Sequence, residues 1–119
     1  MAALPRPQLE AVAKLFRVLA EPTRLEILQL LKEQPRSVND LVTALDVKQA
    51  NVSKQLGILY DVGFVGRQRE GNLVLYSIAE PLIFALCELV CGKLQRDAQR
   101  QLDALQPGRR RSRGRVRRA

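Results

Sequence analysis

Five polar side chains that can form hydrogen bonds crowd one short stretch of the chain. They are Gln49, Asn51, Ser53, Lys54 and Gln55. Glutamine and asparagine can pair with adenine through two hydrogen bonds, and lysine can reach guanine or a phosphate. Val52, Leu56 and Leu59 recur in the same stretch at helical spacing, which predicts a helix with one buried face and one polar face. We interpret the polar face as a reader of double-stranded DNA, with an ordinary solvated helix face as the alternative.

Two arginines, Arg67 and Arg69, alternate along a short β-like segment. Alternate residues of a strand point to the same face. This spacing therefore places two cations side by side, where they could contact DNA phosphates or the minor groove. The alternative is a solvated edge strand protected by its charges.

Cys87 and Cys91 lie four residues apart in a helical pattern, and the chain contains no histidine. Their side chains would be about 5 to 6 Å apart on one helix face, too far for an unstrained disulfide. Two thiols do not complete a soft-metal site, but four thiols across a dimer axis would suit arsenite, a soft metal ion or thiol oxidation. Cysteine is also a small apolar residue that is often buried, so core packing remains equally open.

The apolar periodicity predicts a mainly α chain of about five helices with one β-hairpin. A first helix covers residues 8–20, Pro22 begins a second, and Ser37 with Asp40 forms a capping-box variant that begins a third. The DNA-reading helix follows and ends near Gly63. Strands at 64–69 and 73–78 flank a Gly-Asn turn, and a long helix begins near Pro81.

The 119 residues predict one domain, residues 1–106, followed by a disordered arginine-rich tail at 107–119. The tail holds seven arginines and no acidic residue; without it the net charge falls from +8 to +1, with 13 basic and 12 acidic residues. We expect the tail to add a salt-sensitive term to DNA affinity. No apolar run reaches the roughly 18 residues of a membrane span, and we expect a cytoplasmic protein.

Three segments together resemble the ArsR/SmtB family of bacterial repressors over about residues 15 to 94. Residues 19–28 (LAEPTRLEIL) resemble the family's second helix. Residues 51–59 (NVSKQLGIL), with 63–65 (GFV), resemble its recognition helix and the start of its wing. Residues 67–72 (RQREGN), with Tyr76, resemble the wing. The resemblance implies a winged helix-turn-helix repressor that dimerises through its first and last helices, binds a pseudo-palindromic operator as a homodimer and is released by an inducer.

The chain departs from the family where its members sense metals. Relatives that bind soft metals in the third helix carry Cys-Val-Cys-Asp-Leu, where this chain has Ser37 and Asn39. The zinc-type site of the last helix requires histidines. We therefore expect any inducer, whether arsenite, a soft metal or an oxidant, to act at Cys87 and Cys91. A regulator without sensing is one alternative, and a winged-helix module that binds protein or RNA is another.

Catalysis is not expected from this sequence. The chain shows no nucleophile paired with a base and no glycine-rich phosphate loop, and its acidic residues are scattered singly over polar helix faces.

Overall fold

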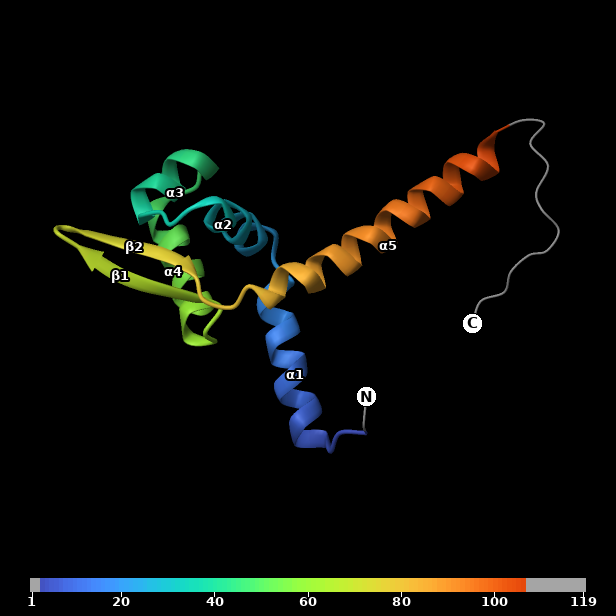
Figure 1. Cartoon of the computed structure of the whole chain (residues 1–119), viewed down its shortest axis with the longest axis horizontal. Helices are drawn as coiled ribbons and strands as arrows, with labels where there is room; N and C mark the ends of the chain where they lie inside the picture. The colour runs from blue at the N-terminus through green and yellow to red at the C-terminus, as the bar shows by residue number, and fades with distance from the viewer. Residues whose placement is uncertain (1–2, 107–119) are drawn as a thin grey trace. The chain divides into compact units, whose positions relative to one another are not determined.

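The computed structural model describes residues 3–106, which form five helices and one β-hairpin (Figure 1). The elements in chain order are α1 (Arg6–Leu19), α2 (Pro22–Glu33), α3 (Val38–Leu45), α4 (Gln49–Asp61), β1 (Val65–Glu70), β2 (Leu73–Ile78) and α5 (Leu82–Leu105). This confirms the predicted winged helix-turn-helix class. None of the helices in this part of the chain is both long and apolar enough to cross a membrane.

The chain divides into two compact units at the junction of Pro81 and Leu82. The first unit holds α1 to α4 and the hairpin, and the second holds α5. The predicted boundary between residues 106 and 107 stays a prediction, because residues 107–119 lie outside the described part of the chain.

A small apolar core holds the first unit together. Its fully buried side chains come from α2, α3, α4 and the start of β1. They are Ile27, Leu28, Leu41, Val52, Leu56, Leu59 and Val65. Each side chain of this size contributes about 1.5 to 3 kcal/mol when it is removed from water, so this cluster fixes how α3 and α4 pack on α2.

The predicted capping box at the start of α3 is confirmed. Ser37 Oγ accepts a hydrogen bond from the Asp40 backbone N–H at 3.1 Å, and Asp40 Oδ2 accepts one from the Ser37 N–H at 3.0 Å. The bond from the Ser37 N–H stabilises the charged carboxylate and, with a smaller contribution from the Ser37 side chain, lowers the pKa of Asp40 below its ordinary value. Asp46 then adopts a left-handed conformation, with φ 53°, and ends α3. The turn that separates the two helices of the helix-turn-helix begins there.

Gly63 ends α4 in a Schellman arrangement. Its φ is 81°, a conformation that a side chain disfavours, and its N–H donates to the Tyr60 carbonyl at 3.0 Å. The Phe64 N–H donates to the Leu59 carbonyl, also at 3.0 Å. This pair of bonds is the expected one for a helix that stops at glycine and turns directly into a strand.

The hairpin pairs β1 and β2 in antiparallel register from Val65↔Ile78 to Glu70↔Leu73. Gly71 has φ 63°, whereas Asn72 keeps a negative φ. Positive φ at the first loop residue alone is the pattern of a type II′ turn. Arg36, between α2 and α3, exchanges both backbone hydrogen bonds with Tyr76, at 3.0 and 2.8 Å, and so attaches the hairpin to the helices.

Candidate nucleic-acid interface

Helix α4 has the two faces that its sequence predicts. Val52, Leu56 and Leu59 are fully buried beneath it. Four of the five predicted readers are exposed on its other side. They are Gln49, Asn51, Ser53 and Lys54. Three hydrogen-bonding side chains and a cation are thus held on a rigid helix and open to a partner, an arrangement suited to reading the edges of base pairs in the major groove.

Gln55 differs from the other four predicted readers because it is buried, with 6% of its surface exposed. Its Oε1 accepts a hydrogen bond from Arg24 Nη1 at 2.7 Å, and its Nε2 donates to Asn51 Oδ1 at 2.9 Å. The sequence pattern groups Gln55 with the other predicted readers, but in the structure its amide is directed inward. Helical spacing explains the burial, since Gln55 lies three residues after Val52 and four before Leu59, both buried.

Arg24 is a residue of this site that sequence reasoning did not assign. Its Nε donates to the Val18 carbonyl at 2.6 Å, in addition to the bond from Nη1 to Gln55. The available signal was its position on α2. Arg24 precedes Ile27 and Leu28 by three and four residues, so helical spacing puts a guanidinium on the buried face, where it must find acceptors.

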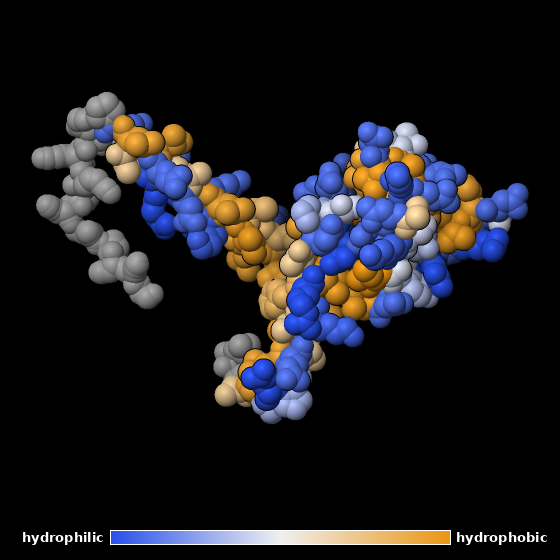
Figure 2. All heavy atoms as spheres, turned by 180° about the vertical axis from the view of Figure 1, so that it is seen from behind, coloured by the Kyte–Doolittle hydropathy of each residue, from blue (hydrophilic) through white to orange (hydrophobic). Residues whose placement is uncertain are grey.

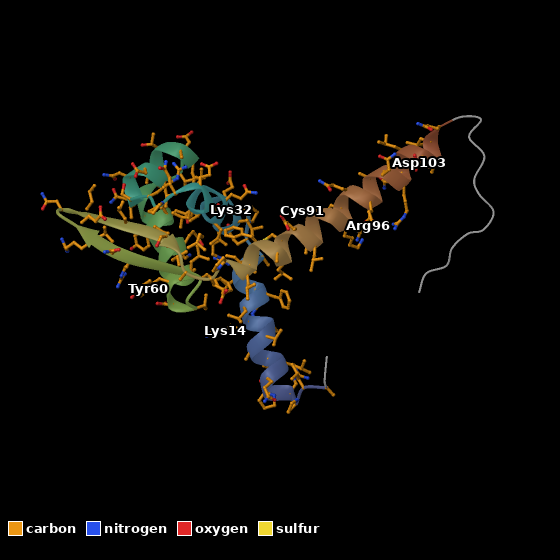
Figure 3. The ribbon with its side chains drawn as sticks, viewed as in Figure 1. Lys14, Lys32, Tyr60, Cys91, Arg96 and Asp103 are labelled. Carbon is orange, nitrogen blue, oxygen red and sulfur yellow. The ribbon has the colours of Figure 1, made fainter. Side chains whose placement is uncertain are left out.

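The two wing arginines have different surroundings. The guanidinium carbon of Arg67 lies 4.0 Å from the ring centroid of Tyr60, which belongs to α4 and is labelled in Figure 3. A hydrogen bond with the side chain of Tyr76, the cross-strand neighbour of Arg67, raises the arginine's pKa above its ordinary value, and Tyr60 adds to the rise. Arg69 is exposed further along the same strand, opposite Val74. Arg67 therefore connects the wing to α4, and Arg69 projects nearer the hairpin tip.

Lys48 takes the N-cap position of α4 without a side-chain hydrogen bond to the helix. Its carbonyl accepts from the N–H groups of Asn51 and Val52, at 3.0 and 3.1 Å. The start of α4 thus carries an exposed ammonium group in place of a capping hydroxyl, and both the helix dipole and this charge favour an anion there.

Cys87 and Cys91 lie on α5, Cys87 half-buried and Cys91 exposed, and neither forms a disulfide. Figure 3 labels Cys91 on that helix. Within residues 3–106, no group of three or more cysteine, aspartate, glutamate or histidine side chains is placed to hold a metal ion. The Ser37 hydroxyl caps α3.

Comparisons with known proteins agree with this geometry. The profile of bacterial regulatory proteins of the arsR family matches residues 21–66. The chain is 37% identical over 106 residues to an uncharacterised HTH-type transcriptional regulator, Rv0081 of Mycobacterium tuberculosis. The aligned region covers 86% of this chain and 93% of that protein. The crystal structure of Rv0081 superposes with a TM-score of 0.74 at 36% identity, and the match covers 82% of this chain and 99% of the other.

Two further solved structures are similar. One is the homodimeric winged helix-turn-helix DNA-binding domain of Mb0332 from Mycobacterium bovis, with a TM-score of 0.66, 32% identity and coverage of 78% of this chain and 92% of that one. The other is the antimony-specific transcriptional repressor AntR, with a TM-score of 0.70, 31% identity and coverage of 83% and 90%.

Proposed function

This chain belongs to the arsR family of bacterial regulatory proteins, whose winged helix-turn-helix members bind DNA and regulate transcription, and from that premise we propose that it represses transcription as a homodimer on a pseudo-palindromic operator. The observation that carries the proposal is α4, with four exposed polar readers over a fully buried apolar face. Two copies related by a two-fold axis would place their α4 helices in successive major grooves, with half-sites about one helical turn apart.

Exposed apolar side chains on α1 and α5 support the homodimer. On α1 they are Leu9, Val12, Leu15 and Phe16, of which Phe16 is 52% exposed. On α5 they include Leu89, Val90, Leu94, Leu102 and Leu105, of which Leu105 is 79% exposed. Figure 2 shows hydrophobic atoms at intervals along α5. Apolar residues repeated along a helix to this extent favour burial against another surface, and a second copy of the same chain is the commonest partner.

The operator is tested by footprinting DNA around the protein's own gene at several salt concentrations. We expect protection of two half-sites about one helical turn apart. Uniform, salt-sensitive coverage without a preferred site would instead support sequence-independent binding, including the alternative of a module that binds RNA or protein.

The homodimer is tested by light scattering during size-exclusion chromatography. We expect a mass about twice the 13.4 kDa of one chain. Leu94→Glu on α5 should lower that mass towards one chain, because a charge would have to be desolvated in the interface. Leu73→Glu is the matched control, since Leu73 is 53% exposed on β2. A wild type with the mass of one chain would contradict the dimer.

For release from the operator, we propose that a thiol-directed inducer acts at Cys87 and Cys91. The similarity to a repressor described as antimony-specific supports a soft ligand of this kind. The two thiols are one helical turn apart on α5, and Cys91 is exposed. Two such helices in a dimer would offer four thiolates, enough for arsenite, a soft metal ion or oxidation between chains.

The inducer is tested by titrating arsenite, zinc and peroxide into the complex with the footprinted DNA. One of these should release the wild type and fail to release Cys87→Ser or Cys91→Ser. Both cysteines of the chain lie on α5, so loss of response in the variants cannot be assigned to a thiol on α4. If both variants respond as the wild type does, the protein is a regulator without thiol sensing.

A further inference from the structure

A chain of three hydrogen bonds runs from the end of α1 to the DNA-facing side of α4. Arg24 Nε donates to the Val18 carbonyl at 2.6 Å, and Arg24 Nη1 donates to Gln55 Oε1 at 2.7 Å. Gln55 Nε2 then donates to Asn51 Oδ1 at 2.9 Å. Gln55 is buried, whereas Asn51 is exposed. The chain therefore ends at a side chain that a base pair can reach.

The donor-to-acceptor direction of these three hydrogen bonds follows from the chemistry of Arg24. A guanidinium group has only donors, so the oxygen of the Gln55 amide must face it. The Gln55 nitrogen then faces Asn51 and requires an acceptor, which is the Asn51 oxygen. The two ends of an amide are normally distinguished only by their partners. Here the Arg24 cation fixes the orientation of the Gln55 amide, and Gln55 in turn fixes the orientation of the Asn51 amide. The Asn51 NH2 group is thereby left on the exposed side of α4.

We propose that Arg24 and Gln55 are positioning residues that set the base preference of α4 by presenting Asn51 as a hydrogen-bond donor. In the major groove, adenine offers asparagine one acceptor and one donor, whereas guanine offers two acceptors, N7 and O6. Because Asn51 Oδ1 is turned towards Gln55, the NH2 group is the part of the amide left to face the DNA, and a donor group favours the two acceptors of guanine over the single acceptor that thymine (O4) or adenine (N7) offers. This inference rests on the proposed reading of operator DNA by α4 and adds the class of base at one position in each half-site.

The Gln55→Glu variant reverses the direction of the last hydrogen bond. One carboxylate oxygen keeps Arg24 as an ion pair, and the other oxygen faces Asn51 and can only accept. Asn51 must then turn its NH2 group inward and present Oδ1 to the DNA. An outward acceptor selects a base that carries a donor, which is cytosine through N4 or adenine through N6.

The experiment selects bound sequences from a pool of random DNA duplexes with the full-length wild type and with Gln55→Glu. We expect one position of each half-site to change from guanine in the wild type to cytosine or adenine in the variant. Each preference should be about fivefold or more, the lower end of what one good base contact supplies. The preference is compared rather than the affinity, because the added negative charge weakens binding to any DNA.

Two further variants keep the result interpretable. Gln68→Glu adds the same charge to the exposed face of β1 and should lower affinity while the preferred bases stay the same. Arg24→Gln replaces a pure donor by an amide that can donate or accept, so Asn51 could take both orientations and the preference at its position should fall towards equality. Thermal melting of each variant confirms that the winged-helix unit is folded.

The outcomes separate this inference from the proposed function. A wild type that selects no sequence overturns both. A wild type that selects a sequence, together with a folded Gln55→Glu variant that selects the same bases, overturns the role of Arg24 and Gln55 alone. If Gln55→Glu does not fold, an unchanged preference in Arg24→Gln overturns it equally.

Discussion

The two wing arginines, which share one strand face, should contribute very differently to the salt dependence of DNA binding. Both side chains are exposed, and Arg69 lies near the hairpin tip, where its charge is available to a phosphate. The guanidinium of Arg67 stacks on Tyr60 at 4.0 Å and bonds to the side chain of Tyr76. We therefore expect Arg69 to carry the phosphate contact, and Arg67 to hold the wing against α4.

The expected magnitude follows from counterion release. Each phosphate neutralised adds about 0.9 to the slope of log affinity against log salt. A dimer presents two wings, so Arg69→Gln should reduce the slope by about 1.8. Over a fourfold rise in salt, from about 50 to 200 mM, a slope change of about 1.8 alters the loss of affinity by about twelvefold. Arg67→Gln should change the slope by less than half as much.

Fluorescence anisotropy with a labelled operator duplex at four or more salt concentrations measures these slopes. Arg96→Gln, on the exposed surface of α5, removes the same charge from the other unit and should leave the slope unchanged. Equal slope changes for Arg67→Gln and Arg69→Gln would refute the division of roles. So would an unchanged slope for Arg69→Gln.

Three other perturbations test how the helices are positioned. Lys48→Ser supplies the cap that α4 lacks, so the free energy of unfolding in urea should rise by about 0.5 to 2 kcal/mol, while DNA affinity falls because a cation is lost. Leu41→Ala removes a fully buried side chain of α3 and should lower the free energy of unfolding by about 2 to 5 kcal/mol; a smaller loss would show that α3 does not depend on this contact. The pKa of Asp40 is lowered in the folded state, so its stabilising effect is present above the unfolded pKa of about 3.9 and is lost as the pH falls through the lower folded value. The urea midpoint of the wild type should therefore fall more steeply in this acidic range than that of Asp40→Asn, and parallel curves would contradict the capping role.

The sequence predicted most of the fold because local signals mark its element ends. Pro22, the Ser37 capping box and Gly63 each lie at a helix end in the structure. The first helix begins at Arg6 rather than Gln8. Pro5 and Pro7 suit the start of a helix, but the spacing of apolar residues, from which the helix is predicted, takes no account of them. The predicted strands are correct to within one residue.

The sequence predicted the reading face of α4 only in part, because residue type does not report which polar group has a partner inside the protein. Gln49 and Gln55 have the same side chain, but it is Gln55 that accepts a hydrogen bond from Arg24. This hydrogen bond joins residues 31 positions apart, which is beyond the range of any local sequence pattern. Arg67 differs, because its pairing with Tyr76 follows from the register of the predicted hairpin, whereas its contact with Tyr60 depends on how the wing packs on α4.

Both contacts involve an arginine that a charge count assigns to DNA or to solvent. In each case the guanidinium contacts a neighbouring side chain within the protein, Gln55 for Arg24 and the Tyr60 ring for Arg67. Residues 1–106 are nearly neutral, so within this part of the chain the charge that reaches a phosphate comes from a few exposed cations such as Lys48, Lys54 and Arg69. On the proposal made above, specific recognition by such a surface would depend on the donors and acceptors that Arg24 holds in place through Gln55.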